Sequence, residues 1–179
     1  FYGASSMNAV LGWDTPKLTN MRQTFHSASK FVGDGLEEWN TGLVTNLAAT
    51  FANAGSVDAD VGTWDVSRVT TMGFGAKTGT FQNAVQFKGV GLDKWITSSL
   101  ITMEYTFLGT DITTVDLGNW DVSQVTTLVD TFRHTAFEGN GLDKWSVAKV
   151  TSGAMGVGQS GMTQTFDNAA SLTSCNKRK

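Results

Sequence analysis

Six tryptophans recur along this chain at nearly constant spacing, and this feature constrains the fold more than any other. The intervals between them are 26, 25, 31, 25 and 25 residues. A fixed period of this length is typical of repeat proteins whose units stack on one another. The tryptophans are Trp13, Trp39, Trp64, Trp95, Trp120 and Trp145.

Other positions of the repeat are as regular as the tryptophan. An aliphatic residue stands three positions before each tryptophan, from Val10 to Leu142, and another stands five positions after it. Every unit also contains a Thr-Phe pair, the first at 24–25. Glycine-rich insertions lengthen the third unit at 73–79 and the sixth at 153–161. Insertions at one phase of a repeat map to loops on one edge of the stack.

Every second unit carries the element Phe-x-Gly-x-Gly-Leu, which begins at Phe31, Phe87 and Phe137. The structural repeat is therefore a pair of units. The glycines predict positive backbone angles at a tight turn. A phosphate-binding glycine loop would need a third glycine and a following helix, and neither is present.

The pattern within a unit predicts two short elements. Alternation in Leu-x-x-Trp-Asp-Val is typical of a strand, and the apolar spacing of Val-Thr-x-Met-x-x-Thr-Phe-x-x-Ala favours a short helix or helical turn. We therefore expect an α/β solenoid, a right-handed, leucine-rich-repeat-like stack of six coils of about 25 residues. Each coil would hold one short parallel strand and one short helix. The solenoid would span residues 1–175 as a single domain, followed by a basic tail at 176–179.

The repeat resembles that of the BspA-like leucine-rich repeat surface proteins, especially the branch with 26-residue repeats found in mycoplasma-type surface lipoproteins. Trp-Asp-Val-Ser with its following Val-Thr is intact at 64–70 and 120–126, and the likeness extends from Phe1 to Cys175. Ile96 and Ser146 stand where the family favours Asp. The resemblance implies a leucine-rich-repeat-like solenoid at the cell surface or outside the cell, and binding or adhesion rather than catalysis. It names no ligand.

Composition argues against several classes of function. The net charge is −3, with 13 Lys and Arg against 16 Asp and Glu, so there is no cationic surplus for nucleic acid. No apolar stretch reaches the roughly 18 residues of a membrane span, so we expect no membrane insertion by this segment. The single cysteine excludes an internal disulfide and a cysteine-based zinc site. We expect no cofactor and no metal.

The tryptophans allow two interpretations. A row of exposed rings could stack against sugars, whereas a buried row would form a core ladder. The aliphatic residue that accompanies every tryptophan favours the core ladder, because large exposed apolar patches are rare on soluble proteins.

The residues that follow the tryptophans are expected on the outward strand face, as an interaction surface for a host or matrix protein or a glycan. An acidic stripe could also bind calcium, but that needs six to eight oxygen ligands, so solvated or turn-capping side chains are favoured. These residues are Asp14, Asn40, Asp65, Ile96, Asp121 and Ser146.

Threonines form two further columns. One contains Thr19, Thr45, Thr70, Thr126 and Thr151 and is interrupted by Ile101; the other is the threonine of each Thr-Phe pair. Regular threonine columns can match ice, which leaves ice binding as a less favoured function. Strand residues and helix caps are the more ordinary roles.

No catalytic residue can be nominated, so we expect no enzyme activity. His26 and His134 stand at different phases of the repeat, and Cys175 has no histidine at a related phase. Nucleophilic catalysis needs a nucleophile, a base and an orienting group within reach of one another.

Both ends of the sequence lie in mid-repeat without a polar capping unit, so we expect head-to-tail contacts between copies. We therefore expect a non-enzymatic extracellular structural or adhesive scaffold that self-assembles into a filament; the alternative is a monomeric surface adhesin. Cys175 could cross-link neighbouring copies or occupy a buried position. The expected contact residues are Phe1, Ala4, Met7, Phe166, Ala169, Leu172 and Cys175.

Overall fold

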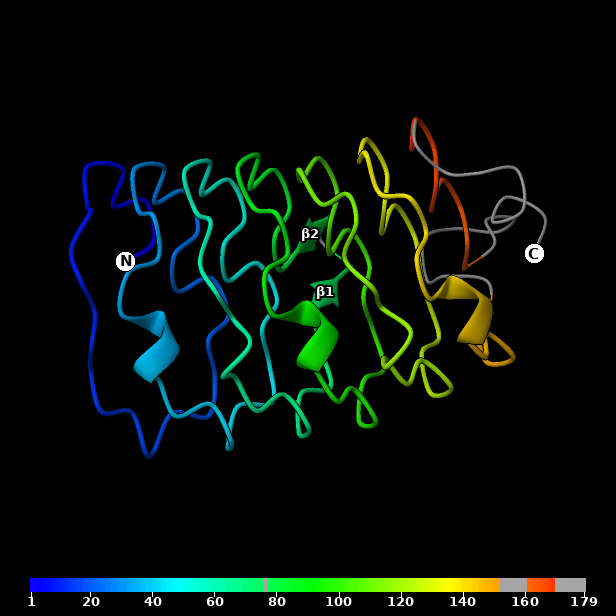
Figure 1. Cartoon of the computed structure of the whole chain (residues 1–179), viewed down its shortest axis with the longest axis horizontal. Coiled ribbons are helices and arrows are strands. Elements are labelled where there is room, and N and C mark those ends of the chain that lie inside the picture. The colour runs from blue at the N-terminus through cyan, green and yellow to red at the C-terminus, as the bar shows by residue number, and fades with distance from the viewer. Residues whose placement is uncertain (76, 152–160, 170–179) are drawn as a thin grey trace.

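Turns and loops make up most of the computed structural model, which describes residues 1–75, 77–151 and 161–169 (Figure 1). Successive repeat units lie side by side along the longest axis of the molecule (Figure 1). Three 3-10 helices and two strands are the named elements of this part. They are η1 (Leu36–Glu38), β1 (Gly73–Phe74), β2 (Thr78–Gly79), η2 (Leu92–Lys94) and η3 (Leu142–Lys144).

The predicted α/β solenoid is wrong. The described residues contain no α-helix, and their only sheet is the antiparallel pair of β1 and β2, with Gly73 opposite Gly79 and Phe74 opposite Thr78. This hairpin lies in the insertion of the third unit, where no strand was expected. The basic tail at 176–179 and the insertion residues 153–160 lie outside the described residues.

The strand expected around each tryptophan is replaced by turns. The backbone N–H of Trp64 donates to the Val61 carbonyl at 3.1 Å, and that of Val69 donates to Val66 at 2.9 Å. These N–H groups cannot also serve a ladder between strands. Among the described residues, the β-bridges between units are therefore isolated and parallel, and they lie seven residues after the tryptophans. The bridges are Asn20–Asn46, Asn46–Thr71, Thr71–Thr102 and Thr102–Thr127.

The helix expected around each Thr-Phe pair is absent for a related reason. Gln23 and Ser27, on either side of Phe25, have φ values of 59° and 58°, which an α-helix does not allow. The N–H of Phe25 donates to the Thr50 carbonyl of the next unit at 2.8 Å. The same bond joins Phe107 to the next unit. The apolar spacing of three and four residues thus comes from consecutive tight turns bonded between units.

Phenylalanine rings form one column of the core. Neighbouring rings from Phe25 through Phe51, Phe81 and Phe107 to Phe132 stack with centroids 5.4 to 5.8 Å apart. All five side chains are fully buried. Stacking of this kind adds to the burial of apolar area, so the column holds successive units at a regular spacing.

Tryptophans form a second column beside the first. Trp39, Trp64, Trp95 and Trp120 are buried, Trp145 is half-buried, and Trp13 is 49% exposed. Four pairs of neighbouring indoles stack, among them Trp95 on Trp120 with centroids 5.7 Å apart. The indole column therefore lies inside the molecule along its middle part and reaches solvent at the first unit.

The first unit departs from the sequence alignment by one residue. Val10, aligned with the aliphatic position before each tryptophan, is 72% exposed, and Leu11 is buried instead. The N–H of Leu11 donates to the Asp34 carbonyl, as the N–H of Leu117 donates to Asn140. Leu11 therefore occupies the inward position, because it stands two residues before Trp13, whereas the aliphatic residue of every other unit stands three before its tryptophan.

The predicted positive angles at the paired glycines are confirmed. The second glycine of each pair has a φ between 84° and 87° and immediately precedes η1, η2 or η3. A Cβ atom added to Gly91 would lie 2.2 Å from the backbone nitrogen of Gly62 in the preceding unit. The turn therefore requires glycine both for its φ and for the close approach of two backbones.

Candidate functional site

The six residues that follow the tryptophans are all exposed. We call this column, from Asp14 to Ser146, the outer stripe. Five of its members are short and polar. The sixth, Ile96, is 65% exposed and belongs to the fourth unit. A large aliphatic side chain therefore stands out from an otherwise polar column.

Three side chains of the outer stripe close tight turns. Asn40 accepts a hydrogen bond from the N–H of Gly42 at 3.2 Å, Asp65 accepts one from Ser67 at 3.0 Å, and Asp121 accepts one from Ser123 at 2.9 Å. This is the turn-capping role that was weighed against calcium binding. The Ser67 side chain and then its N–H hold the pKa of Asp65 below its ordinary value. Ser123 lowers the pKa of Asp121 in the same way.

A hollow of about 440 Å³ adjoins the outer stripe at its middle. Thr63, Asp65 and Ser67 line it from the third unit, and Lys94 and Ile96 from the fourth. It thus places one carboxylate, one ammonium group and two hydroxyls next to the exposed Ile96 side chain. Such a combination of apolar centre and polar surround is typical of protein interfaces.

The threonine columns differ in their exposure. In the first, Thr45 and Thr70 are partly or fully exposed, and each hydroxyl donates to a carbonyl of the preceding unit, at 3.4 and 3.2 Å. In the second, Thr50 and Thr80 are fully buried. The Thr50 hydroxyl bonds the carbonyls of Leu47 at 2.7 Å and Met21 at 3.0 Å, so this column bridges backbones and caps no helix.

The residues expected at end-to-end contacts lie at the two ends of the described chain. Phe1 is 45% exposed and its ring stacks on Phe25, while Phe166 is 37% exposed and stacks on Phe132. Ala4 and Met7 are half-buried, and Ala169 is buried. Leu172 and Cys175 lie outside the described residues.

The two histidines belong to different ends of the molecule. The ring of His26 stacks on Tyr2 with centroids 4.7 Å apart, and burial lowers the pKa of His26. His134 is exposed, and its backbone N–H donates to the carbonyl of Asp167. Among residues 1–75, 77–151 and 161–169, no three His, Cys, Asp or Glu side chains lie close enough to hold a metal ion. The same residues include no helix that is long and apolar enough to cross a membrane.

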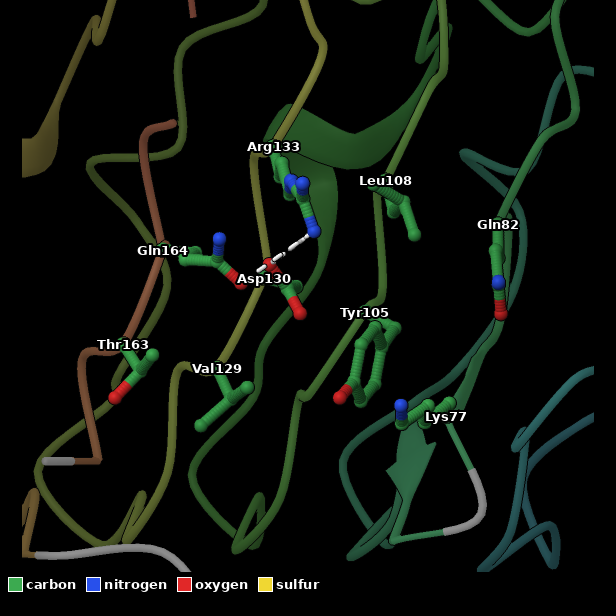
Figure 2. A pocket seen from close by; sticks show the side chains of 9 residues that line it. All are labelled: Lys77, Gln82, Tyr105, Leu108, Val129, Asp130, Arg133, Thr163 and Gln164. Carbon is green, nitrogen blue, oxygen red and sulfur yellow. Dashed lines mark hydrogen bonds and ion pairs between the residues drawn. The ribbon is translucent and has the colours of Figure 1, made fainter. Parts of the chain in front are cut away.

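A second hollow, of about 450 Å³, lies over the turns around the Thr-Phe pairs (Figure 2). We call it the Tyr105 pocket. Its walls come from four successive units, so it exists only because these units lie side by side. It is lined by Lys77, Gln82, Tyr105, Leu108, Val129, Asp130, Arg133, Thr163 and Gln164.

The hairpin of the third unit is fixed close to this pocket. A Cβ atom added to Gly79 of β2 would lie 2.1 Å from the Tyr105 carbonyl oxygen, so glycine allows the two backbones to touch. On the other side of the hairpin, the Arg22 guanidinium lies over the Phe74 ring, 5.1 Å from its centre. Lys77 stands in the turn between β1 and β2, and the hairpin thereby brings it to the pocket wall.

Arg133 organises the charges of the Tyr105 pocket. Its Nε lies 3.2 Å from Asp167 Oδ2, and its Nη1 lies 3.5 Å from Asp130 Oδ1. Burial raises the pKa of Asp130, and the charge of Arg133 opposes this effect. Burial also raises the pKa of Tyr105, and the negative charge of Asp130 raises it further. Asp130 and Tyr105 are thus a buried polar pair held beneath the guanidinium.

Sequence reasoning missed the Tyr105 pocket. The position two residues before the phenylalanine is Gln23, Ala49 or Gly79 in the first three units and becomes Tyr105 and then Asp130. The available signal was this change to an aromatic and then an acidic side chain, together with Arg133 directly after the phenylalanine of the fifth unit. It could not be used, because the segment was expected to be a helix.

The sequence profile of a family described as "Mycoplasma protein of unknown function, DUF285" matches residues 1–77 and again residues 75–176. Each match covers three of the six tryptophan units. No curated protein matches this chain, and no solved structure does. The match agrees with the mycoplasma-type part of the resemblance seen in the repeat, and does not extend to the BspA-like name.

Proposed function

Since the chain belongs to this Mycoplasma family of unknown function, DUF285, we propose that it is a non-catalytic extracellular adhesive scaffold. Its outer stripe binds a host or matrix protein. The observation that carries this proposal is the 65% exposed Ile96 side chain at the centre of a polar column. An exposed aliphatic side chain surrounded by polar groups supports a protein partner, because burying its apolar surface at an interface is favourable.

The turns of the outer stripe support the same function. In both Asp65 and Asp121, one carboxylate oxygen accepts a hydrogen bond from the backbone N–H two residues later. Their side chains are therefore held in place before any partner binds. A surface that is ordered in advance loses less conformational freedom on binding. Lys94 and Asp65 beside Ile96 add charges of both signs that set the orientation of a partner.

Adhesion of beads coated with the 179-residue chain tests this proposal. Surfaces of fibronectin, laminin, collagen and cultured epithelial cells serve as probes. We expect retention on at least one surface, and a loss of about fivefold or more for Ile96→Asp, as for a central interface residue. Val85→Asp is the matched control, because Val85 is 55% exposed and lies outside the outer stripe.

Two results would contradict the proposal. If wild-type beads are retained on none of the surfaces, the protein is not an adhesin for these partners. If Val85→Asp lowers retention as much as Ile96→Asp, the outer stripe is not the binding surface. Unfolding curves of both variants show whether either change acts through the fold.

A second candidate function is self-association. The Phe1 ring is 45% exposed and stacks on Phe25 at 5.5 Å, so a ring from a second copy would find the same stacking geometry as the internal column. Sedimentation velocity across a concentration series tests this. Growth of the sedimentation coefficient with concentration, lost in Phe1→Ser, would support it; a constant value would contradict it.

A further inference from the structure

The turn that precedes η3 contains Asn140, the only asparagine of the sequence that is followed by glycine. An asparagine in this setting can lose its side-chain amide, because a following glycine leaves its backbone nitrogen accessible and its conformation free. The corresponding residue is Asp34 in the second unit and Val90 in the fourth. The sixth unit therefore differs from its two counterparts in a chemically reactive position.

The fold holds Asn140 in a conformation that opposes this reaction. The N–H of Leu142 donates to the Gly139 carbonyl at 3.2 Å, and Gly141 has φ 84° and ψ −8°. These values are typical of a type II turn, in which the first central residue, here Asn140, has a ψ of about +120°. Loss of the amide begins with an imide ring, which closes only when Cβ of Asn140 and the Gly141 nitrogen lie on the same side of the Cα–C bond. For an L-residue this needs a ψ of the opposite sign.

Three contacts with the fifth unit keep this turn closed. The Asn140 side-chain amide donates to the Thr114 carbonyl at 3.1 Å, and the Asn140 carbonyl accepts the N–H of Leu117 at 3.1 Å. Gly141 lies against Gly118, since a Cβ atom added to Gly141 would be 2.1 Å from the Gly118 nitrogen. Rotating ψ of Asn140 breaks the bond to Leu117 and displaces Gly141. The reaction therefore requires the turn to open away from the fifth unit.

From this arrangement we propose that Asn140 is a modification site controlled by the turn: it stays intact while the turn is closed and deamidates when the turn opens. The Gly141 nitrogen attacks Cγ of Asn140, so that an N–Cγ bond forms and the Cγ–Nδ2 bond breaks. Nδ2 leaves as ammonia with the proton of the Gly141 amide. Water then opens the imide. Breaking the new N–Cγ bond gives aspartate, and breaking the original main-chain bond gives isoaspartate.

The two products differ in their fit to the turn. Aspartate fits, because Asp34 occupies the same position in the second unit, where its carbonyl accepts the N–H of Leu11 at 2.9 Å. Isoaspartate adds a methylene to the main chain next to Gly141, where two backbones are already in contact. The isoaspartate product therefore keeps the turn open. No residue of the outer stripe takes part, so the site does not depend on the adhesive role proposed for that stripe.

Timed incubation of the 179-residue chain in buffer and in concentrated urea, at the same mildly alkaline pH, tests the proposal. Proteolysis and mass spectrometry measure the loss of Asn140. A synthetic peptide of residues 136–145 in the same two solvents corrects for the effect of urea on the chemistry. We expect Asn140 to react fastest of all asparagines in urea, and at least about tenfold more slowly in buffer, because only the open fraction reacts.

Two results of the incubation would overturn the proposal. Equal corrected rates in buffer and in urea would show that the closed turn gives no protection. No reaction at Asn140 in urea, or a faster reaction at another asparagine, would remove the site.

Variants distinguish opening of this turn from unfolding of the whole chain. Leu117→Ala removes a fully buried side chain from the residue that bonds Asn140, and should raise the rate in buffer about tenfold or more. Leu36→Ala is the matched control, because Leu36 is equally buried at the same repeat position of the second unit, and it should accelerate the reaction much less. Equal acceleration would contradict control by this turn. Trp145→Phe removes only the 2.9 Å bond to the Leu117 oxygen and gives a milder test in the same direction.

The products provide a second, independent measurement. Asn140→Val copies Val90 and should form no acidic species with time. The isoaspartate form, separated by chromatography from aged protein, should melt at a lower temperature than Asn140→Asp. Equal melting temperatures would show that the added methylene does not hold the turn open.

Discussion

The indole Nε1 of Trp95 donates a 2.8 Å hydrogen bond to the backbone oxygen of Val61, which lies in the preceding repeat unit. The same bond recurs at Trp39, Trp64, Trp120 and Trp145, with lengths between 2.6 and 2.9 Å. Each of these indoles therefore fills the core of its own unit and also ties it to the unit before. This explains why tryptophan, rather than another large apolar residue, marks the repeat.

Replacing Trp95 by Phe should destabilise the protein by about 2 to 4 kcal/mol, because the Val61 oxygen loses its donor and a cavity opens in the core. Trp13→Phe is the control, since Trp13 is 49% exposed, and it should cost less than about 1 kcal/mol. Urea unfolding followed by circular dichroism measures both. Similar losses in the two variants would show that the indole bond contributes little.

Gly91→Ala should destabilise the protein by at least about 3 kcal/mol, because the new methyl group meets the Gly62 backbone and the φ of 87° is strained for alanine. Gly75→Ala meets nothing within 4 Å and should leave the unfolding free energy almost unchanged. Thermal unfolding of the pair checks the expectation. An equal midpoint for Gly91→Ala and the wild type would contradict the close backbone contact.

Thr80→Val tests the buried threonine column. The Thr80 hydroxyl bonds the carbonyls of Met72 at 2.8 Å and Leu47 at 2.9 Å, and valine has the same shape without the hydroxyl. The expected cost is about 1 to 2 kcal/mol in chemical unfolding. Thr45→Val, at an exposed position with a 3.4 Å bond, should change the unfolding free energy by less than about 0.5 kcal/mol. A larger effect at Thr45 would reverse the roles assigned to the two columns.

Acid should weaken the fold through Asp65 and Asp121. Their folded-state pKa values lie below the ordinary value of 3.8, so their contribution to stability is complete above that value. It is lost as the pH falls through the lowered pKa. The double variant Asp65→Asn, Asp121→Asn keeps the acceptor oxygens and should show a flatter dependence of melting temperature on pH below about 4.

Two comparisons make the pH experiment specific. Asp14→Asn is the control, because Pro16 stands two residues later and has no N–H to donate, so this change should leave the profile as it is. Asp130 acts with the opposite sign, since burial raises its pKa and its contribution to stability falls as the pH rises through that pKa. A double variant with the steep wild-type profile would show that the two turns do not contribute.

Periodicity predicted the side of the chain on which each residue lies better than it predicted the local conformation. Phe25 and Val44 are buried and Asp65 is exposed, as the alignment implies, because the inward positions repeat in sequence. The strand and helix were wrong, since positive φ values at residues such as Gln23 and Ala49 divide the chain into turns. Neither residue type favours positive φ, and bonds between units stabilise it here.

The Tyr105 pocket could not be predicted from the sequence, for a different reason. Its charge depends on Lys77, which an insertion delivers, and the position of that insertion depends on the contact between Gly79 and the Tyr105 backbone. The outer stripe, in contrast, needed only the repeat and could be placed from Asp14 to Ser146. A site built from one repeated column is thus readable from sequence, and a site built where a repeat is broken is not.

The contact of each glycine turn with the preceding unit limits how many repeat units the gene can gain or lose at once. Gly35 packs on Gly12, Gly91 on Gly62 and Gly141 on Gly118, so each glycine turn meets the backbone of the unit before it in the same way. Deleting one unit would join two units of the same kind and remove this complementary surface. Unequal recombination within the gene should therefore be tolerated when it adds or removes two units together, and copy number among related alleles should vary in even steps.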